Sequence, residues 1–313
     1  MTYDKGPHDL GAGSFAWLVP EGHWGESNTG LVRGDGESLL VDTLYDLDHT
    51  QEMLDGYAPL TVDHPIRTLV NTHSDGDHWF GNQLVAGEGV EIIASDAAAA
   101  SMTQHNVDEM IALPHRHDHV GDFIRPIAAN FDLSGIVPTP PTHTFSGHLD
   151  LDIGGREVRL IEVGPAHTDG DVLIHVPEAG VVYTGDIVFI GGAPLVWTGP
   201  ISACIAAIDQ ILALEPTVVV PGHGPLTDSK GVRRVRDYLE HVATEATVRF
   251  RAGLTVEEAI DSIDMSAFAD LSEQGRIAAN VLNVYEELDP ERPRADRGEQ
   301  FSRIAAWELG VTA

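Results

Sequence analysis

The chain has 313 residues, which is long enough for one large domain or two smaller ones. Its formal net charge of -31 makes polyanions poor partners, so we expect neither nucleic acid nor an anionic membrane to bind. The sequence contains no apolar run of about 18 residues, the minimum for a membrane-spanning helix. Hydrophobic content of 42% and a mean hydropathy of -0.06 are typical of a globular protein.

The N-terminal segment and the cysteine content predict a cytoplasmic protein. Residues 1–13 contain Asp4, His8 and Asp9 but no apolar segment typical of a secretory signal. The single cysteine, Cys204, cannot form an intrachain disulfide, which suits a reducing compartment. Its apolar neighbours indicate a thiol packed on a buried helix face.

The first half of the chain reads as short strands alternating with helices. Glycines at 34 and 36 between two apolar runs indicate a hairpin. A serine or aspartate at 95 or 96 is a suitable helix cap. We predict strands over 15–19, 29–33, 38–41, 66–70 and 91–94, and helices over 47–57, 83–86 and 96–110.

The second half begins after an irregular segment, 114–141, whose length favours a substrate-facing loop or an interface. No Gly/Ser-rich or charged linker follows it. We therefore predict a single domain over 1–313, with a core over about 14–225 and a helical C-terminal extension over about 226–313. The predicted strands are 148–153, 157–163, 172–176, 181–184 and 217–220, and the helices are 200–214, 229–251, 255–263 and 272–288.

Four potential metal ligands lie close together directly after the strand at 66–70. Alternation along an extended loop points His73, Asp75 and Asp77 the same way, and His78 adds an imidazole beside them. A solvated polar turn is the alternative, because Asp, Gly and Ser are ordinary loop residues.

Three later segments supply possible partners for this loop. In each, an apolar strand leads into a turn of small residues and then to His167, Asp186 or His223. Strand ends at one edge of a sheet hold polar side chains rigidly. Glycines beside these residues let the backbone approach an ion closely.

These motifs, taken in order, resemble those of the metallo-β-lactamase fold hydrolases. They are the His-x-x-x-Asp-His run from His73, the Gly-x-x-His-Thr around His167, the Thr-Gly-Asp ending at Asp186 and the Gly-His-Gly around His223. The resemblance extends from about residue 28 to residue 225. It implies an α/β protein with an αββα sandwich of two similar halves and metal ions at one edge.

The resemblance also implies a role for each ligand. Asp42, at a strand end, would orient a ligating imidazole. Asp186 would bridge two ions. The first ion would be held by His73, Asp75 and His167, and the second by Asp77, His78 and His223.

Asp75 departs from the family pattern, which commonly has a second histidine there. A carboxylate favours harder ions such as Mn²⁺ or Fe²⁺ at the first position. Alternatively, the first position is weakly occupied and the remaining ligands hold a single ion. We expect zinc, as one or two ions.

A metal-dependent hydrolase is the predicted function. The ion would lower the pKa of a bound water to near neutrality and present hydroxide to the substrate. Asp77 would act as the catalytic residue by accepting a hydrogen bond from that water. We expect a small organic substrate with an ester, lactone, thioester or amide bond.

Other functions remain open from the sequence. Within hydrolysis, the alternatives are dehalogenation of an aromatic compound and cleavage of a β-lactam. A di-iron oxidoreductase is an alternative of another class, because relatives of that type carry a carboxylate at the position of Asp75. They depend on a flavin module, however, and no phosphate-cradling motif of that kind is present. A non-catalytic binding module is a third reading.

Candidate pocket walls are the aromatic residues near the ligands and one histidine. We predict that Trp79, Phe189 and Trp197 line the pocket, with packing alone as the alternative for each. We also place His117, from the histidine cluster at 115–119, in the substrate pocket. The alternative is that this cluster lies on a solvated or interfacial loop. Homodimers are expected from the frequency of symmetric oligomers.

Overall fold

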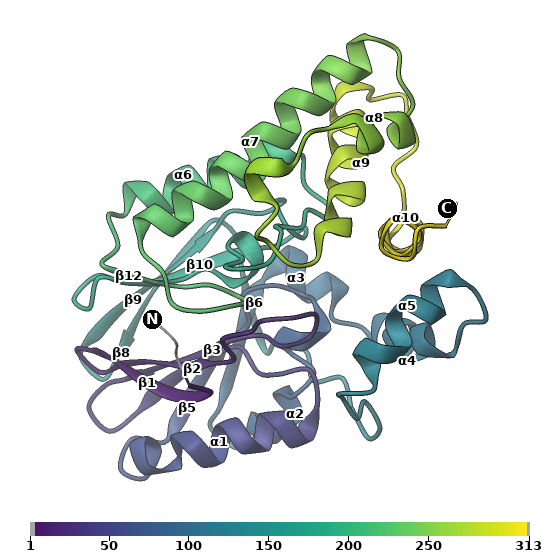
Figure 1. Cartoon of the computed structure of the whole chain (residues 1–313). Helices are drawn as coiled ribbons and strands as arrows, with labels where there is room; N and C mark the ends of the chain where they lie inside the picture. The colour runs from purple at the N-terminus through teal and green to yellow at the C-terminus, as the bar shows by residue number, and fades with distance from the viewer. Residues whose placement is uncertain (1–3, 312–313) are drawn as a thin grey trace.

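Two β-sheets pack face to face between outer layers of helices (Figure 1). The computed structural model describes residues 4–311. This arrangement is the predicted αββα sandwich, and the helices after residue 228 form the predicted C-terminal addition. Within the described residues, no helix is both long and apolar enough to cross a bilayer.

The first sheet has seven strands that lie side by side in chain order. The β1–β2, β2–β3 and β3–β4 pairs are antiparallel, and the β4–β5, β5–β6 and β6–β7 pairs are parallel. The β3–β4 pair is the predicted hairpin. The strands are β1 (Gly6–Gly11), β2 (Ser14–Leu18), β3 (Thr29–Arg33), β4 (Ser38–Val41), β5 (Ile66–Val70), β6 (Glu91–Ser95) and β7 (His143–Phe145).

The second sheet has five strands in the order β12-β11-β10-β9-β8. All of its pairs are antiparallel except β11–β12, which is parallel. Its strands are β8 (His148–Ile153), β9 (Arg156–Glu162), β10 (Val172–Val176), β11 (Val181–Tyr183) and β12 (Val218–Val220).

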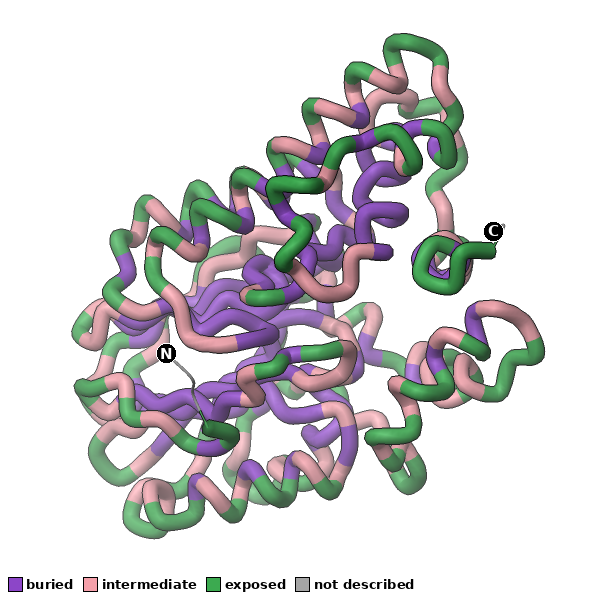
Figure 2. Tube along the Cα trace, in the orientation of Figure 1, coloured by how far each residue is buried: buried purple, intermediate pink, exposed green. Residues whose placement is uncertain are grey.

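Strand alternation divides the core into layers. On β3, Leu31 faces α1 (Leu47–Thr61) and packs with Met53 and Tyr57, whereas its neighbour Val32 faces the second sheet. The central strands are accordingly buried on both faces, as Figure 2 shows. The two sheets therefore fix the positions of their strand ends.

The outer helices begin at side-chain caps that the sequence supplies. Asp46 caps α1 by accepting a hydrogen bond from His49 N, and Asp228 caps α7 in the same way from Lys230 N and Gly231 N. Cys204 is buried on α6, as predicted. The remaining helices are α2 (Asn82–Val85), α3 (Asp96–Ser101), α4 (Gln104–Ala112), α5 (His119–Ala128), α6 (Ile201–Ala213), α7 (Ser229–Arg251), α8 (Val256–Ser262), α9 (Ile277–Leu288) and α10 (Arg297–Leu309).

Three of the predictions differ from the structure. The helix expected over 96–110 is two helices, because the Thr103 side chain accepts from Asn106 N and caps a new helix, α4. The segment 114–141, predicted to be irregular, contains α5, which Asp118 caps by accepting from Gly121 N. The helix expected from residue 272 begins as α9 only at Ile277, after a 3₁₀ turn.

The C-terminal helix α10 was not predicted, although its signals are present. Asp296 caps it by accepting from Glu299 N, and Gly310 ends it in a left-handed conformation. Its buried residues Phe301, Ile304 and Ala305 follow helical spacing and pack against α5. In Figure 1 α5 and α10 accordingly lie together at one end of the sandwich.

Candidate metal centre

Four predicted ligands lie on the loop that follows β5. A 3₁₀ turn over Gly76–His78 tightens this loop, and Asn71 Nδ2 donates to His78 O at 2.9 Å across its base. A Cβ at Gly76 would lie 2.5 Å from the Phe80 ring, so this close turn requires glycine. The rings of His73 and His78 consequently lie 4.2 Å apart, centroid to centroid.

The other three ligands come from the second sheet. His167 lies on the loop between β9 and β10, Asp186 follows β11 and His223 follows β12. A Cβ at Gly222 would lie 1.9 Å from Asp186 Oδ1, so only glycine lets this chain segment pass the carboxylate. The strand ends of the two sheets thus meet at one edge, as predicted.

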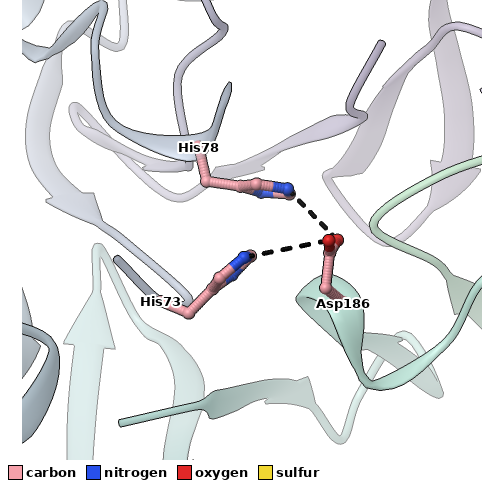
Figure 3. A group of neighbouring side chains, drawn as sticks. All are labelled: His73, His78 and Asp186. Carbon is pink, nitrogen blue, oxygen red and sulfur yellow. Dashed lines mark ion pairs between the residues drawn. The ribbon is translucent and has the colours of Figure 1, made fainter. Parts of the chain in front are cut away.

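Asp186 is at the focus of four imidazoles. His78 Nε2 lies 3.2 Å from its Oδ1, and Nε2 of both His167 and His223 lies 3.4 Å from its Oδ2. His73 Nε2 lies 3.9 Å from Oδ2, and Figure 3 shows His73 and His78 pointing toward the carboxylate. This is the central position expected of a bridging ligand.

The ligand atoms form three overlapping groups, each within 4.8 Å. They are His73, Asp75 and His167; Asp77, His78 and His223; and His73, His78 and Asp186. The first two groups are the two predicted ligand sets, and Asp186 joins them.

A divalent cation fits this arrangement. The buried Nε2 of His73 has no hydrogen-bond partner, and the buried His78 Nε2 and Asp186 Oδ1, although 3.2 Å apart, are not aligned for a hydrogen bond. Leaving such atoms unsatisfied is costly. Imidazole nitrogens and carboxylate oxygens in sets of three suit zinc and related ions.

Asp42 contacts His78, which is the contact that its predicted orienting role requires. Its Oδ2 lies 2.9 Å from His78 Nδ1 and also accepts from Thr72 Oγ1 at 2.7 Å, while Oδ1 accepts from Thr72 N at 2.7 Å. These contacts direct the opposite ring nitrogen, Nε2, into the site. Burial lowers the pKa of His78, but the Asp186 and Asp42 carboxylates raise it well above its usual value.

The two histidines of the first group are also fixed, in each case through the ring nitrogen Nδ1. His167 Nδ1 donates to Leu195 O at 2.8 Å, and His73 Nδ1 lies 2.9 Å from Thr72 Oγ1. Burial, together with His78, lowers the pKa of His73 to about 3. His73 is therefore a neutral imidazole at neutral pH, the form that binds metal.

Asp171 is a supporting residue that the sequence did not single out. It accepts hydrogen bonds from Thr168 N and Thr168 Oγ1 and so closes the loop that carries His167. Burial raises the pKa of Asp171 to about 6. Its place four residues after His167, in the same small-residue turn, was the available signal.

Asp75 has partners that spacing could not predict. Its Oδ1 pairs with Arg297 Nη1 at 2.5 Å, and its Oδ2 accepts from Trp197 Nε1 at 3.1 Å. Burial would raise the pKa of Asp75, but the Arg297 guanidinium and the His167 ring hold it well below its usual range. Arg297 lies 222 positions along the chain, on the helix that was missed.

A cavity of about 70 Å³ opens over the ligands and has mainly apolar and aromatic walls. Trp24, Trp197 and Phe301 form one aromatic cluster, with ring centroids 4.9 to 6.3 Å apart. A second cavity of about 450 Å³ adjoins it and shares Gly76, Met110, Arg297 and Phe301 as walls. Both α4 and α10 therefore help to build the pocket.

The predicted wall residues divide between these cavities and the surface. Phe189 and Trp197 line the cavity over the ligands, as expected. Trp79 instead lines the adjoining cavity, because its indole turns to donate to Ser74 O at 2.9 Å. His117 is exposed and lines neither cavity, which disagrees with its predicted place. Its neighbour His119 contacts Ser302 on α10, so this segment is an interface within the chain.

The sequence model of the metallo-beta-lactamase superfamily matches residues 22–223, which is more than half of the chain and includes every predicted ligand. The chain belongs to the metallo-beta-lactamase superfamily. Within this superfamily, similarity to 2,4-dinitroanisole O-demethylase subunit alpha of Nocardioides sp. is 22% identity over 296 residues, covering 93% of this chain and 74% of that protein. Hydroxyacylglutathione hydrolase of Fuscovulum blasticum is 28% identical over 123 residues, covering 39% of this chain and 46% of that protein.

Solved structures of superfamily members share the fold. The stereoselective inverting sec-alkylsulfatase from Pseudomonas sp. superposes with a TM-score of 0.70 at 17% identity over 98% of this chain. The chain spans only 55% of that protein's length. A metallo-beta-lactamase from Pontibacter korlensis superposes with a TM-score of 0.57 at 19% identity, covering 75% of this chain and 98% of that one.

Proposed function

We propose that this protein is a metal-dependent hydrolase of a small, predominantly apolar or aromatic organic molecule. The observation that carries the proposal is that members of all three ligand groups line one largely apolar cavity. An ester, lactone, thioester or amide is the proposed substrate group. Apolar walls with a few convergent polar groups are typical of small-molecule sites.

The resident ions, zinc in this proposal, would supply Lewis acidity and lower the pKa of a water to near neutrality. The carboxylate of Asp77 lines the cavity and lies 3.3 Å from His223 Nε2. There it accepts the proton of the attacking water as the new carbon–oxygen bond forms. The proton then passes to the leaving group as its bond to carbon breaks.

Tyr45 lines the cavity, and its hydroxyl would be a hydrogen-bond donor there. Burial, together with the Asp77 and Asp75 carboxylates, raises the pKa of Tyr45 well above its usual value. The phenol therefore keeps its proton at neutral pH. In the proposed reaction it donates to negative charge that develops on a substrate oxygen.

A second candidate is hydrolytic displacement of a substituent from an electron-poor aromatic ring. Two observations favour it: the aromatic cluster of Trp24, Trp197 and Phe301, and the similarity to 2,4-dinitroanisole O-demethylase subunit alpha over 93% of this chain. Water would add at the ring carbon and the substituent would leave as an alcohol or halide. The same candidate ligands would hold the metal, and Asp77 would again accept the proton of the attacking water.

The test is a panel of substrates supplied to metal-loaded protein. It includes 4-nitrophenyl acetate, a thioester, an aromatic lactone, 2,4-dinitroanisole, a dinitro-halobenzene and a β-lactam. We expect turnover of the aromatic ester or lactone that is lost on chelation and restored by Zn²⁺. Turnover of the dinitroanisole or halobenzene alone would select the second candidate, and chelator-insensitive turnover would contradict both.

A further inference from the structure

The carboxylate of Asp75 is held on both oxygens by groups that face it from outside the loop. Oδ1 is paired with Arg297 Nη1 at 2.5 Å. Oδ2 accepts from Trp197 Nε1 at 3.1 Å and lies 3.2 Å from His167 Nε2. Oδ1 is held in the ion pair, whereas Oδ2 has a longer hydrogen bond from the indole and faces His167, so Oδ2 is the oxygen that Asp75 offers to the first ligand group.

The guanidinium of Arg297 is itself fixed in place. It stacks over the Trp197 ring at 4.8 Å from the centroid, and Gln300 Nε2 on the same helix donates to Trp197 O at 2.8 Å. The Asp296 cap sets the start of α10 directly before Arg297. The C-terminal helix thus delivers one cation to the edge of the predicted metal position.

Among the described residues that line the cavity, no second arginine or lysine is free to pair with Asp75. Arg276 also lines the cavity, but Nη1 donates to Ala193 O at 2.9 Å and Nη2 pairs with Glu273 at 2.6 Å. Its guanidinium lies over the rings of Trp24 and Phe189. Arg297 is therefore the specific counterion of Asp75.

We propose that Arg297 is a positioning residue for the first metal position: it holds Asp75 as a one-oxygen ligand and offsets its charge. Carboxylate and guanidinium together are formally neutral, like the histidine that family members commonly carry at this point. The pair thereby keeps the first position suited to zinc in spite of the acidic ligand. This inference rests on the metal centre of the proposed function, but not on any substrate.

A double-mutant cycle on metal affinity tests the proposal. Zn²⁺ affinity is measured by competition with a chromophoric chelator, and the first position is the binding step that Asp75→Ala removes. In an Asp75→His background, Arg297→Gln removes an uncompensated cation and should tighten Zn²⁺ binding. In the wild-type background, Arg297→Gln also releases the Asp75 carboxylate. The increase in Zn²⁺ affinity should therefore be about tenfold smaller than in the Asp75→His background, or the affinity should fall.

The result that would overturn the proposal is an equal effect of Arg297→Gln in both backgrounds, within about threefold. Absence of any stoichiometric Zn²⁺ binding would overturn it as well, together with the proposed metal centre. Circular dichroism checks that each variant folds, and the Co²⁺ spectrum of Arg297→Gln replaces the cycle as the test if Asp75→His does not fold. If the double-mutant cycle gives the expected difference but the protein hydrolyses no substrate, the proposed function is refuted and the role of Arg297 is not.

Cobalt spectroscopy gives a readout that a purely structural role would not move. With Arg297→Gln the Asp75 carboxylate is free to offer both oxygens, which raises the coordination number and weakens the visible absorption of bound Co²⁺. The matched control is Arg303→Gln on the same helix, where Arg303 pairs with Glu299 and Glu257 away from the site. Its spectrum should equal that of wild type, and an equally unchanged Arg297→Gln spectrum would contradict the one-oxygen geometry.

Discussion

At the scale of single residues, Asp77 has the largest part in the proposed reaction. It belongs to the second group of candidate ligands and is also the proposed proton acceptor. We expect Asp77→Asn to lower kcat by about 10²- to 10⁴-fold, because the amide cannot accept the proton. The melting temperature of the metal-free protein should change little. The control is Asp237→Asn, which alters an exposed carboxylate on α7; wild-type activity in the Asp77 variant would remove it from the mechanism.

Asp42 gives a second residue-scale prediction, based on its backbone. Its φ of 60° lies in the left-handed region, which asparagine tolerates and alanine does not. Asp42→Asn should fold normally yet weaken metal affinity about 10- to 100-fold, because His78 loses its anionic partner. Asp42→Ala should in addition unfold at a lower denaturant concentration. Unchanged metal affinity in Asp42→Asn would show that His78 needs no such support.

At the scale of secondary-structure elements, the ligand motifs were predictable and the pocket walls were not. Each ligand directly follows an apolar strand, so the local sequence placed His167, Asp186 and His223 at one sheet edge. Arg297 and Phe301 lie on α10, and only tertiary packing of α10 against α5 brings them to the cavity. No spacing rule relates such a helix to a loop more than 200 positions earlier.

The docking of α10 can be tested through Phe301. This side chain is 4% exposed and packs between Trp24 and Trp197. Phe301→Ala should lower the free energy of unfolding by about 3 to 5 kcal/mol, as expected for a large buried aromatic residue. On the same helix Trp307 is 41% exposed, and Trp307→Ala should cost no more than about 0.5 kcal/mol. Denaturant titration measures both, and equal losses would mean that Phe301 is not a core residue.

At the scale of the whole molecule, the candidate metal ligands come from both sheets. His73, Asp75, Asp77 and His78 follow β5 of the first sheet, whereas His167, Asp186 and His223 belong to the second. Metal bound to the folded state alone adds about 2.7 kcal/mol of stability when its free concentration is about 100 times Kd. Chelation should therefore lower the melting temperature, and Zn²⁺ should restore it. A melting temperature that changes neither on chelation nor on addition of Zn²⁺ would argue against ions bound between the two sheets.

The sandwich itself was predictable because its strands are short apolar runs bounded by turns, and the family motifs fixed their order. The local errors arose where a single polar side chain decides the structure. Thr103 ends one helix and begins the next, and Asp118 starts a helix inside a segment that was rich in turn residues. Threonine and aspartate are common residues, so their type alone does not show which of them caps a helix.

We propose above that the His and Asp side chains around Asp186 hold divalent ions. The most direct test of this proposal is the metal content of the purified protein after equilibrium dialysis against Zn²⁺, measured by mass spectrometry beside the Asp186→Asn variant. The overlapping ligand groups predict two ions per chain in wild type and a loss of at least one in the variant. Absence of stoichiometric metal in folded wild-type protein, or an undiminished content in Asp186→Asn, would contradict the account.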